Sequence, residues 1–355
     1  MATQASLMQP TAAPGGVEQW GDPSGSWRGQ WSAVRTACGL LDARFRAIVR
    51  VTGSDRVTFL QGMVTNDVAP LHDGEGTYAA LLTIQGRIVA DMRIYALADE
   101  LWLDLPAARV EPVCAALERF IVADDVELAV GDWVPLVSIE GPHADAAVQR
   151  LTGLAVAGHR RYGHRAVSIG GETCRIAAVT HTGERGWLIC APPASGDRVG
   201  AQLGALTLAR VEPPVLDALR IEAGIPWYGR DMDESMLISE VGLEEAISFR
   251  KGCYLGQEVV ERVAARGQVH RKLVGLTASA AAFAPDGAKL YRDATEVGWV
   301  TSTAFSPACD AVVALGYVRR EVSELGTQLI ARVGERELAM VATALPFYRG
   351  SATTQ

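Results

Sequence analysis

The stretch FRKGCYLGQEVVERVAARGQVHRKL, residues 249–273, separates two kinds of sequence in this chain. A helix is predicted from about Gly256 to Ala265, because apolar residues recur at helical spacing between Val259 and Ala264. Upstream of this helix, strand-like and helix-like segments alternate. Downstream of it, strand-like segments stand alone, so the stretch marks a boundary between two classes of domain.

The downstream part predicts a separate β-domain over residues 269–350. Turns separate its strand-like segments and no helical pattern intervenes, which is typical of a small closed or sandwiched β-structure. The six segments are VHRKLVGL, AKLYRD, TEVGWVTSTA, AVVALGYVRR, TQLIARV and ELAMVATAL.

The upstream part predicts an α+β architecture in two units. In the first unit, a strand at 46–53 precedes a helix at 54–64, two strands follow within 77–97, and a helix is expected at 110–122. Residues 1–30 form a tail rich in small residues that we expect to be mobile. We place the first domain at 31–134 and the second at 135–268, ending in the stretch quoted above.

Composition narrows the class of protein. The 355 residues carry a net charge of −8 and are 49% hydrophobic, which indicates a globular chain and argues against broad nucleic-acid binding. The six cysteines show no metal-binding spacing, so no metal site is expected. We find no signal peptide and no apolar run of membrane length, and therefore expect a cytoplasmic protein without a membrane contact.

Cys253 is the first candidate functional residue. Gly252 and Gly256 flank it, the predicted helix begins just after it, and Arg250 and Lys251 precede it. A helix N-terminus and nearby cations both favour a thiolate. The alternative is a small buried hydrophobe, which is the commoner role of a single cysteine.

The charge of residues 250–272 suggests an anionic partner. Six Lys and Arg residues stand here against only Glu258 and Glu261, in a chain that is acidic overall. A carboxylated ligand, a phosphate or an RNA backbone would each satisfy this excess, and a weak RNA contact is one expectation. The alternative is a solvated helix face.

Several motifs together resemble a known family. KGCYLGQE (251–258) looks like the signature of the YgfZ-type folate-binding proteins, a branch of the glycine-cleavage T-protein, or aminomethyltransferase, family. HTGERGW (181–187) and LRIEAGIPWYGRD (219–231) resemble two further elements of that family, and residues 51–95 resemble its first third. The strand-only part falls where the family carries a β-barrel.

The resemblance implies three domains in a ring around a central channel that binds tetrahydrofolate or another reduced folate. The first two domains need not be contiguous in sequence. For the YgfZ branch it implies assistance in the assembly or repair of iron–sulfur proteins, including tRNA-modifying enzymes, without a defined catalytic turnover. The expected partners are therefore folate and iron–sulfur proteins or their assembly factors.

The resemblance also suggests which residues form the site. Cys253 would be the functional thiol, Asp91 would lie near the reactive folate nitrogen, and Arg220 and Glu222 would pair with the folate tail and support it. The alternatives are a strand residue facing water for Asp91 and an exposed helical ion pair for the other two. Further cofactor-binding candidates are Lys251, Gln257, Glu258, Tyr78 and Asn66, with Trp227 and Tyr228 weaker.

Two departures from the enzymes of the family favour a protein that binds folate without turning it over. Leu188 stands where the aminomethyltransferases place a carboxylate that holds the pterin. Ala90 precedes Asp91 where they carry a pair of acids. Two alternatives remain open: a folate-dependent aminomethyltransferase, or a non-catalytic module that binds a protein or tRNA.

Overall fold

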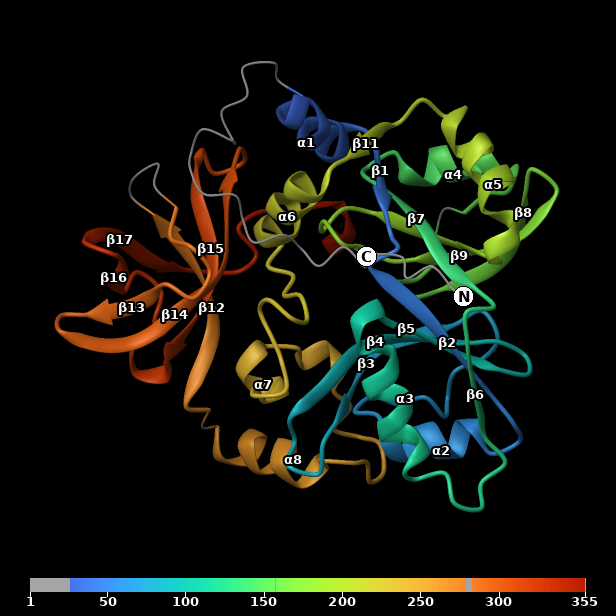
Figure 1. The fold of residues 1–355 in the computed structure, drawn as a ribbon, viewed down its shortest axis with the longest axis horizontal. Coiled ribbons are helices and arrows are strands. Elements are labelled where there is room, and N and C mark those ends of the chain that lie inside the picture. Colours follow the sequence, from blue (N-terminus) through green and yellow to red (C-terminus); the bar gives the residue numbers. More distant parts are fainter. Residues whose placement is uncertain (1–25, 157, 268, 279–282, 355) are drawn as a thin grey trace, which may run out of the picture.

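The structure, a computed structural model, describes residues 26–156, 158–267, 269–278 and 283–354. The tail predicted for 1–30 lies mostly outside these residues. Three β-structures surround a centre crossed by helices α6 and α7 (Figure 1). Two are open sheets and the third is a closed six-stranded barrel, so the α+β fold with a C-terminal β-barrel is confirmed.

The five-stranded sheet carries the first half of the candidate site. Its strand order is β3-β4-β5-β2-β6, with all neighbours antiparallel. The helices α2 (Arg56–Met63) and α3 (Val110–Glu118) contribute Leu60 and Val113 to the apolar core on one face of this sheet. The strands are β2 (Arg46–Thr52), β3 (Gly76–Leu82), β4 (Ile88–Ala96), β5 (Leu101–Pro106) and β6 (Glu127–Val130).

The six-stranded sheet has the order β11-β1-β7-β10-β9-β8, and only β1 and β11 run parallel. Helices α4 (Ala144–Thr152) and α5 (Gly196–Gly204) add Val148 and Val199 to its core. The strands are β1 (Gly39–Asp42), β7 (Val134–Glu140), β8 (His164–Ile169), β9 (Glu172–Ala178), β10 (Gly186–Ala191) and β11 (Ala209–Val211).

The chain passes between the two sheets more than once. Strand β1 precedes the five-stranded sheet in sequence, yet it pairs with β7 of the six-stranded sheet. Helix α1 (Ser26–Thr36) likewise contacts β11 and α6. We therefore keep the domain limits 31–134, 135–268 and 269–350 as a proposal in which the first two units are discontinuous.

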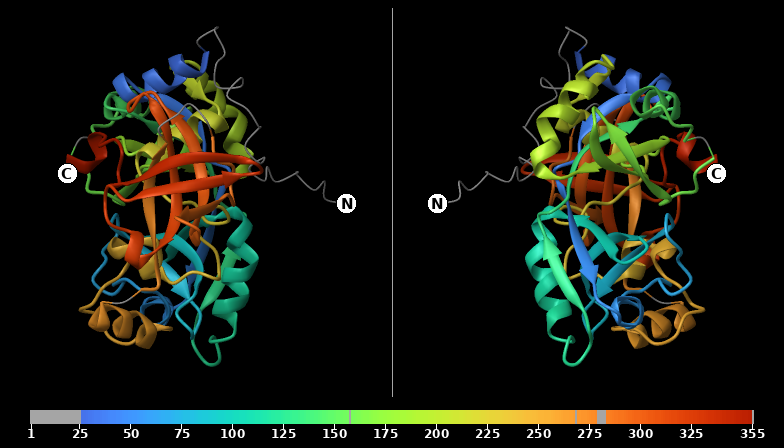
Figure 2. Two further views of the ribbon diagram at one scale, coloured as in Figure 1. Left: turned by 90° about the vertical axis from the view of Figure 1, so that its left-hand side faces the viewer. Right: turned by 90° about the vertical axis from the view of Figure 1, so that its right-hand side faces the viewer.

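The barrel closes in the order β12-β15-β14-β13-β16-β17. Figure 2 shows it from its own side, with α1 above it and α8 below. Leu276, Val300 and Ala314 lie in its buried interior. The strands are β12 (Arg271–Ala278), β13 (Lys289–Arg292), β14 (Thr295–Ser306), β15 (Ala311–Arg319), β16 (Gln328–Val333) and β17 (Arg336–Thr343).

Three helices join the sheets to the barrel. Helix α6 (Pro213–Glu222) packs on β14 and β15, and α7 (Ile238–Val241) packs on β12 and α8 (Gln257–Arg266). No described helix is both long and apolar enough to cross a membrane.

After the barrel, the chain returns to the six-stranded sheet. The backbone nitrogen of Tyr348 donates to the carbonyl of Glu222, and the backbone nitrogen and hydroxyl of Ser351 both donate to the carboxylate of Glu184, at 2.8 and 2.7 Å. Gly350 lies against Gly183, where any larger residue would meet backbone at 2.4 Å. This return segment ties the barrel's end to the turn that follows β9.

Candidate functional site

Asp91 lies in the middle of β4 on the face opposite the apolar core. Its Oδ2 accepts a hydrogen bond from the Tyr78 hydroxyl at 3.0 Å and lies 3.7 Å from the Arg46 guanidinium. Its Oδ1 is buried and has no hydrogen-bond partner among the described residues. Asp91 is only 6% exposed, so it is not the water-facing strand residue considered as the alternative. A buried carboxylate oxygen without a donor indicates a position for a ligand or a water.

Tyr78 forms an aromatic wall beside this carboxylate. Its ring stacks on Tyr162, with the ring centroids 6.2 Å apart. Burial, followed by the charge of Asp91, raises the pKa of Tyr78 well above 10, so its hydroxyl is a donor at neutral pH. The hydroxyl of Tyr162, the second ring of this pair, donates to Glu245 at 3.3 Å.

The guanidinium of Arg46 lies between two carboxylates, those of Asp91 and Asp104. Its Nε donates to Asp104 at 2.7 Å, and Arg93 donates to the same carboxylate at 2.9 Å. Burial opposes ionisation of Asp104, but the two guanidinium groups outweigh it and hold its pKa at about 2. This ion cluster fixes Arg46 beside Asp91.

The residues that depart from the family pattern are both buried. Ala90 points into the apolar core with Met92 and Ile94, on the face of β4 opposite Asp91. Adjacent strand residues face opposite sides, so an acid at position 90 would not lie next to the carboxylate of Asp91. Leu188 is fully buried in an apolar cluster with Trp102, and it supplies no polar group.

Arg220 and Glu222 hold the molecule together from within. Arg220 is fully buried, donates to Asp231 and Asp217 at 2.6 Å each, and donates to the Ser302 hydroxyl at 2.7 Å. The ion pair considered for Arg220 and Glu222 is therefore neither exposed nor formed between these two residues. Since its polar neighbours occupy the guanidinium of Arg220, we assign it to the junction of α6 with the barrel rather than to a folate tail.

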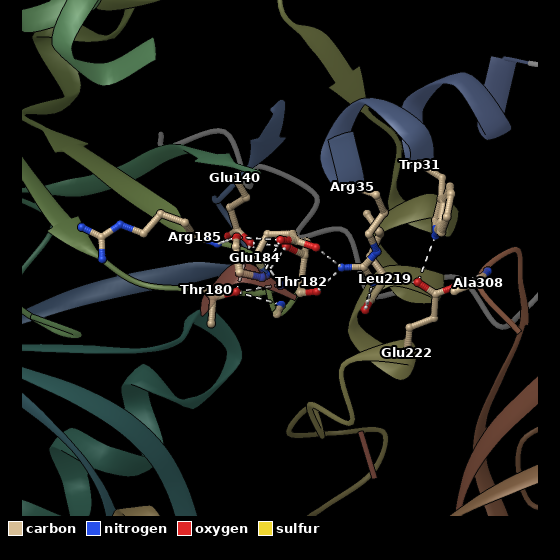
Figure 3. A network of polar contacts seen from close by, with 12 residues as sticks. Trp31, Arg35, Glu140, Thr180, Thr182, Glu184, Arg185, Leu219, Glu222 and Ala308 are labelled. Carbon is tan, nitrogen blue, oxygen red and sulfur yellow. Dashed lines mark hydrogen bonds and ion pairs between the residues drawn. The ribbon is translucent and has the colours of Figure 1, made fainter. Parts of the chain in front are cut away.

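Glu222, like Arg220, is fully buried, and polar neighbours surround its carboxylate (Figure 3). Its carboxylate accepts from Arg35 at 2.6 Å and from Trp31 at 2.9 Å. It also accepts from the Ser306 hydroxyl at 2.6 Å. Arg35 also donates to Glu184 at 3.0 Å. These contacts join α1, α6, the barrel and the turn after β9, so Glu222 supports the fold.

Cys253 is exposed in the loop before α8, so it is not a core residue. Gly256 adopts a φ of +82° and packs against the backbone of Thr83 at the tip of the β3–β4 hairpin, where only glycine fits. Gln257 accepts from the backbone nitrogen of Tyr254 at 3.2 Å, and Glu258 is exposed on α8. The predicted turn and helix start are thus present.

Lys251 points inward rather than toward Cys253. Its ammonium donates to three backbone carbonyls, those of Gln61, Val64 and Asn66, at 2.6, 2.7 and 2.9 Å. Burial lowers its pKa to about 8, so it remains mainly charged at neutral pH. Lys251 therefore anchors its loop to the end of α2.

Asn66 links this anchor to the aromatic wall. Its side-chain amide donates to the carbonyl of Tyr78 at 2.8 Å and to that of Glu245 at 2.9 Å. Lys251, Asn66, Tyr78 and Asp91 therefore form one connected chain of contacts, whereas Arg220 and Glu222 lie in a different part of the fold. Trp227 stacks on Phe45 at 4.9 Å, and the Tyr228 hydroxyl donates to the carbonyl of Ile88 at 3.3 Å.

Sequence reasoning missed three residues of the candidate site: Arg46, which lies beside Asp91, Tyr162, which stacks on Tyr78, and His181, which is bound by Glu140. Arg46 and Tyr162 come from segments distant in sequence, and no local motif points to them. His181 is the first residue of the HTGERGW element, and its place in that element is the one signal in the sequence that points to it. Among the described residues no group of three or more His, Cys, Asp or Glu side chains could hold a metal ion.

The chain is similar to known aminomethyltransferases over most of its length. Aminomethyltransferase of Synechococcus sp. (strain RCC307) is 33% identical, covering 89% of both chains, and that of Thermosynechococcus vestitus is 30% identical, covering 91% of this chain and 88% of its own. The crystal structure of glycine cleavage system aminomethyltransferase T from Bartonella henselae superposes with a TM-score of 0.84 at 24% identity, covering 93% and 91% of the two chains.

These relatives overturn the leading functional interpretation of the sequence. An iron–sulfur assembly role without turnover was preferred, whereas the relatives carry the name of a transferase. The interpretation failed because it gave two substituted positions and an eight-residue signature more weight than the similarity of the whole chain. Iron–sulfur and RNA partners find no support in these comparisons.

Two family descriptions account for nearly all of the structure. The GCVT N-terminal domain matches residues 18–251, and the glycine cleavage T-protein C-terminal barrel domain matches residues 271–349. Tetrahydrofolate, expected above as the cofactor, is the cofactor of this family. The chain belongs to the glycine cleavage T-protein family.

Proposed function

We propose that this protein is a folate-dependent aminomethyltransferase, which transfers a one-carbon unit from an aminomethylated carrier to tetrahydrofolate. The similarity to aminomethyltransferases across 89% of the chain supports the activity. The observation that carries the proposal is the buried Asp91 carboxylate with an unpartnered oxygen. A carboxylate in this position can hold or accept the proton of a substrate N–H.

The residues around Asp91 fit a reduced pterin. The ring of tetrahydrofolate bears several N–H donors, and Asp91 Oδ1 is a buried acceptor without a donor. Tyr78 and Tyr162 supply an aromatic surface of the kind that flat ligand rings contact. The Tyr78 hydroxyl and Arg46 both contact Oδ2, the other oxygen, which leaves Oδ1 as the oxygen for the ligand.

The two substitutions have different consequences for the proposal. Because Ala90 faces the apolar core, its identity leaves the carboxylate of Asp91 unchanged. Leu188 removes a polar group, so we expect pterin orientation to depend on other acceptors. The argument for lost catalysis that rested on a missing acid pair no longer applies.

We further propose that the chain belongs to the YgfZ-type branch, on the strength of KGCYLGQE at 251–258, and that it differs from the expectation for that branch in retaining catalytic turnover. The exposed Cys253 is compatible with a functional thiol in that segment. We also propose a cytoplasmic location. All six cysteines lie in the described residues and are free thiols, which is typical of a reducing compartment.

Turnover with purified protein, tetrahydrofolate and an aminomethylated lipoyl carrier tests the activity. Asp91→Asn should lower kcat by about 100-fold or more, because general acid–base assistance contributes roughly 10²–10⁴-fold. Asp99→Asn, at an exposed position, is the matched control and should retain full activity. Absence of turnover in the unmodified protein would refute the proposal, and an unimpaired Asp91→Asn variant would remove Asp91 from it.

A further inference from the structure

His181 lies in the turn between β9 and β10 and is held by one buried carboxylate. Glu140, at the end of β7, accepts from His181 Nδ1 at 2.6 Å and from the His181 backbone nitrogen at 3.0 and 2.9 Å. Thr182 donates to Glu140 from its backbone nitrogen and its hydroxyl, at 3.0 and 2.7 Å (Figure 3). The hydroxyl of Ser138 donates to the same carboxylate at 2.8 Å. The imidazole ring therefore has a fixed orientation.

These contacts also fix the tautomer of His181. Burial alone would raise the pKa of Glu140, but its interactions with His181 and the hydrogen bond from Thr182 outweigh burial and keep the pKa below its ordinary value. Glu140 is thus a charged group that only accepts hydrogen bonds. Nδ1 must carry the proton that the ring shares with Glu140, and Nε2 is left for another partner.

Burial and the neighbouring positive charges favour the neutral form of the ring. Burial lowers the pKa of His181, and the positive charges of Arg93 and Arg46 lower it further against the opposing effect of Glu140. Phe45 also contacts the ring in a T-shaped arrangement, with the ring centroids 5.3 Å apart. A neutral ring with its proton on Nδ1 presents a bare lone pair at Nε2.

His181 Nε2 is buried and has no hydrogen-bond partner among the described residues, although His181 is only 2% exposed. It shares this state with Asp91 Oδ1. Arg46 lies near both sites, because its guanidinium is 3.7 Å from Asp91 and its charge also acts on the ring of His181. The five-stranded sheet and the turn of the six-stranded sheet thus each supply one buried acceptor without a donor.

We propose that His181 Nε2 accepts a hydrogen bond from a ring N–H of the bound pterin and, together with Asp91, selects the tetrahydro ring over the oxidised one. The inference rests on the proposed function. Tetrahydrofolate carries hydrogens on N5 and N8, whereas folic acid has bare nitrogens there. Two acceptors that face a bare nitrogen lose their hydrogen bonds, and unpaired buried acceptors weaken binding. His181 is thereby a specificity-determining residue.

Calorimetric titration with tetrahydrofolate under anaerobic conditions, and with folic acid, tests this selection. In His181→Asn, the side-chain amide can still donate to Glu140 from the position of Nδ1, but nothing replaces Nε2. Affinity for tetrahydrofolate should fall about 5- to 10-fold, as expected for one neutral hydrogen bond, while that for folic acid stays within about 2-fold. The matched control is His164→Asn, since His164 is equally buried and its Nε2 accepts no ligand but contacts the Ala96 carbonyl at 2.9 Å.

The outcomes separate the inference from the function beneath it. If the unmodified protein binds tetrahydrofolate and His181→Asn binds it equally well, the Nε2 atom meets only solvent and the inference is overturned while the function stands. If the unmodified protein bound folic acid as tightly as tetrahydrofolate, the proposed selection of the tetrahydro ring would be refuted. If the unmodified protein binds no tetrahydrofolate, both fall.

Nitrogen-15 NMR of the histidine rings gives a readout that needs no activity. We expect His181 to show a protonated Nδ1 and a bare Nε2 at pH 7.5, with the Nε2 signal moving when tetrahydrofolate is added. A ring protonated at Nε2 in the free protein would contradict the inference directly, because such a nitrogen cannot accept a hydrogen bond.

Discussion

Replacing Arg220 by Met distinguishes a structural ion pair from a ligand-binding arginine. The guanidinium is fully buried and makes hydrogen bonds to Asp217, Asp231, Ser302 and the carbonyl of Ile225. Asp231 is itself buried, and its pKa is lowered, against the effect of burial, by Arg220 and by hydroxyl donors. Removing the cation leaves this carboxylate charged and only partly compensated. Breaking one partner of such a pair costs about 3–5 kcal/mol.

Guanidinium chloride unfolding, followed by circular dichroism, measures this loss. We expect Arg220→Met to lower the free energy of unfolding by about 4 kcal/mol, with the greatest loss in the barrel, where Ser302 loses its donor. Arg220→Lys should recover part of it, and Arg210→Met, at an exposed position on β11, should change stability by less than about 0.5 kcal/mol. A variant that stays fully stable and loses only tetrahydrofolate affinity would show that Arg220 binds ligand after all.

Two further predictions concern single buried side chains. Lys251→Met should lower the free energy of unfolding by roughly 2–4 kcal/mol in the same assay, because three backbone carbonyls lose a charged donor. The control Lys272→Met, at an exposed position, should have little effect. If Lys251→Met kept its full stability and lost only folate affinity, the anchoring role would be contradicted. Burial and the charge of Arg175 lower the pKa of His164 to about 4 in the folded protein. Between pH 6.5 and 4, His164 is therefore protonated in the unfolded chain but remains neutral in the folded chain. Stability should therefore fall as the pH drops through that window, by up to about 3 kcal/mol from this group, and His164→Asn should flatten the slope. An unchanged slope in the variant would refute the assignment.

The elements of the fold follow closely from local patterns. The expected strand at 46–53 corresponds to β2, and the expected helix at 256–265 to α8. The helix expected at 110–122 ends earlier, at Glu118, since residues beyond it form turns. The spacing of apolar residues predicts such elements because it reflects which face of a helix or strand is buried. This pattern lies within the sequence of each element.

The partners of these elements were harder to foresee. Strand β1 joins β7 and β11 across about a hundred residues or more, and no pattern within GLLD specifies that pairing. The site divides in the same way. Asp91 and Tyr78 are neighbours on paired strands, so a local interpretation found both. His181 meets Glu140 only through the turn of another sheet, and Arg220 meets Ser302 only through the barrel.

The return of residues 348–351 to the turn after β9 has a consequence for the order of assembly. The ribosome synthesises these residues after the whole barrel. The hydrogen bonds from Ser351 to Glu184 can therefore form only after the barrel has left the exit tunnel. Until then, a carboxylate buried in the finished protein lacks two of its donors. The nascent sheets can take shape early, but the contact between the segment after the barrel and the turn after β9 can form only once the barrel has been synthesised.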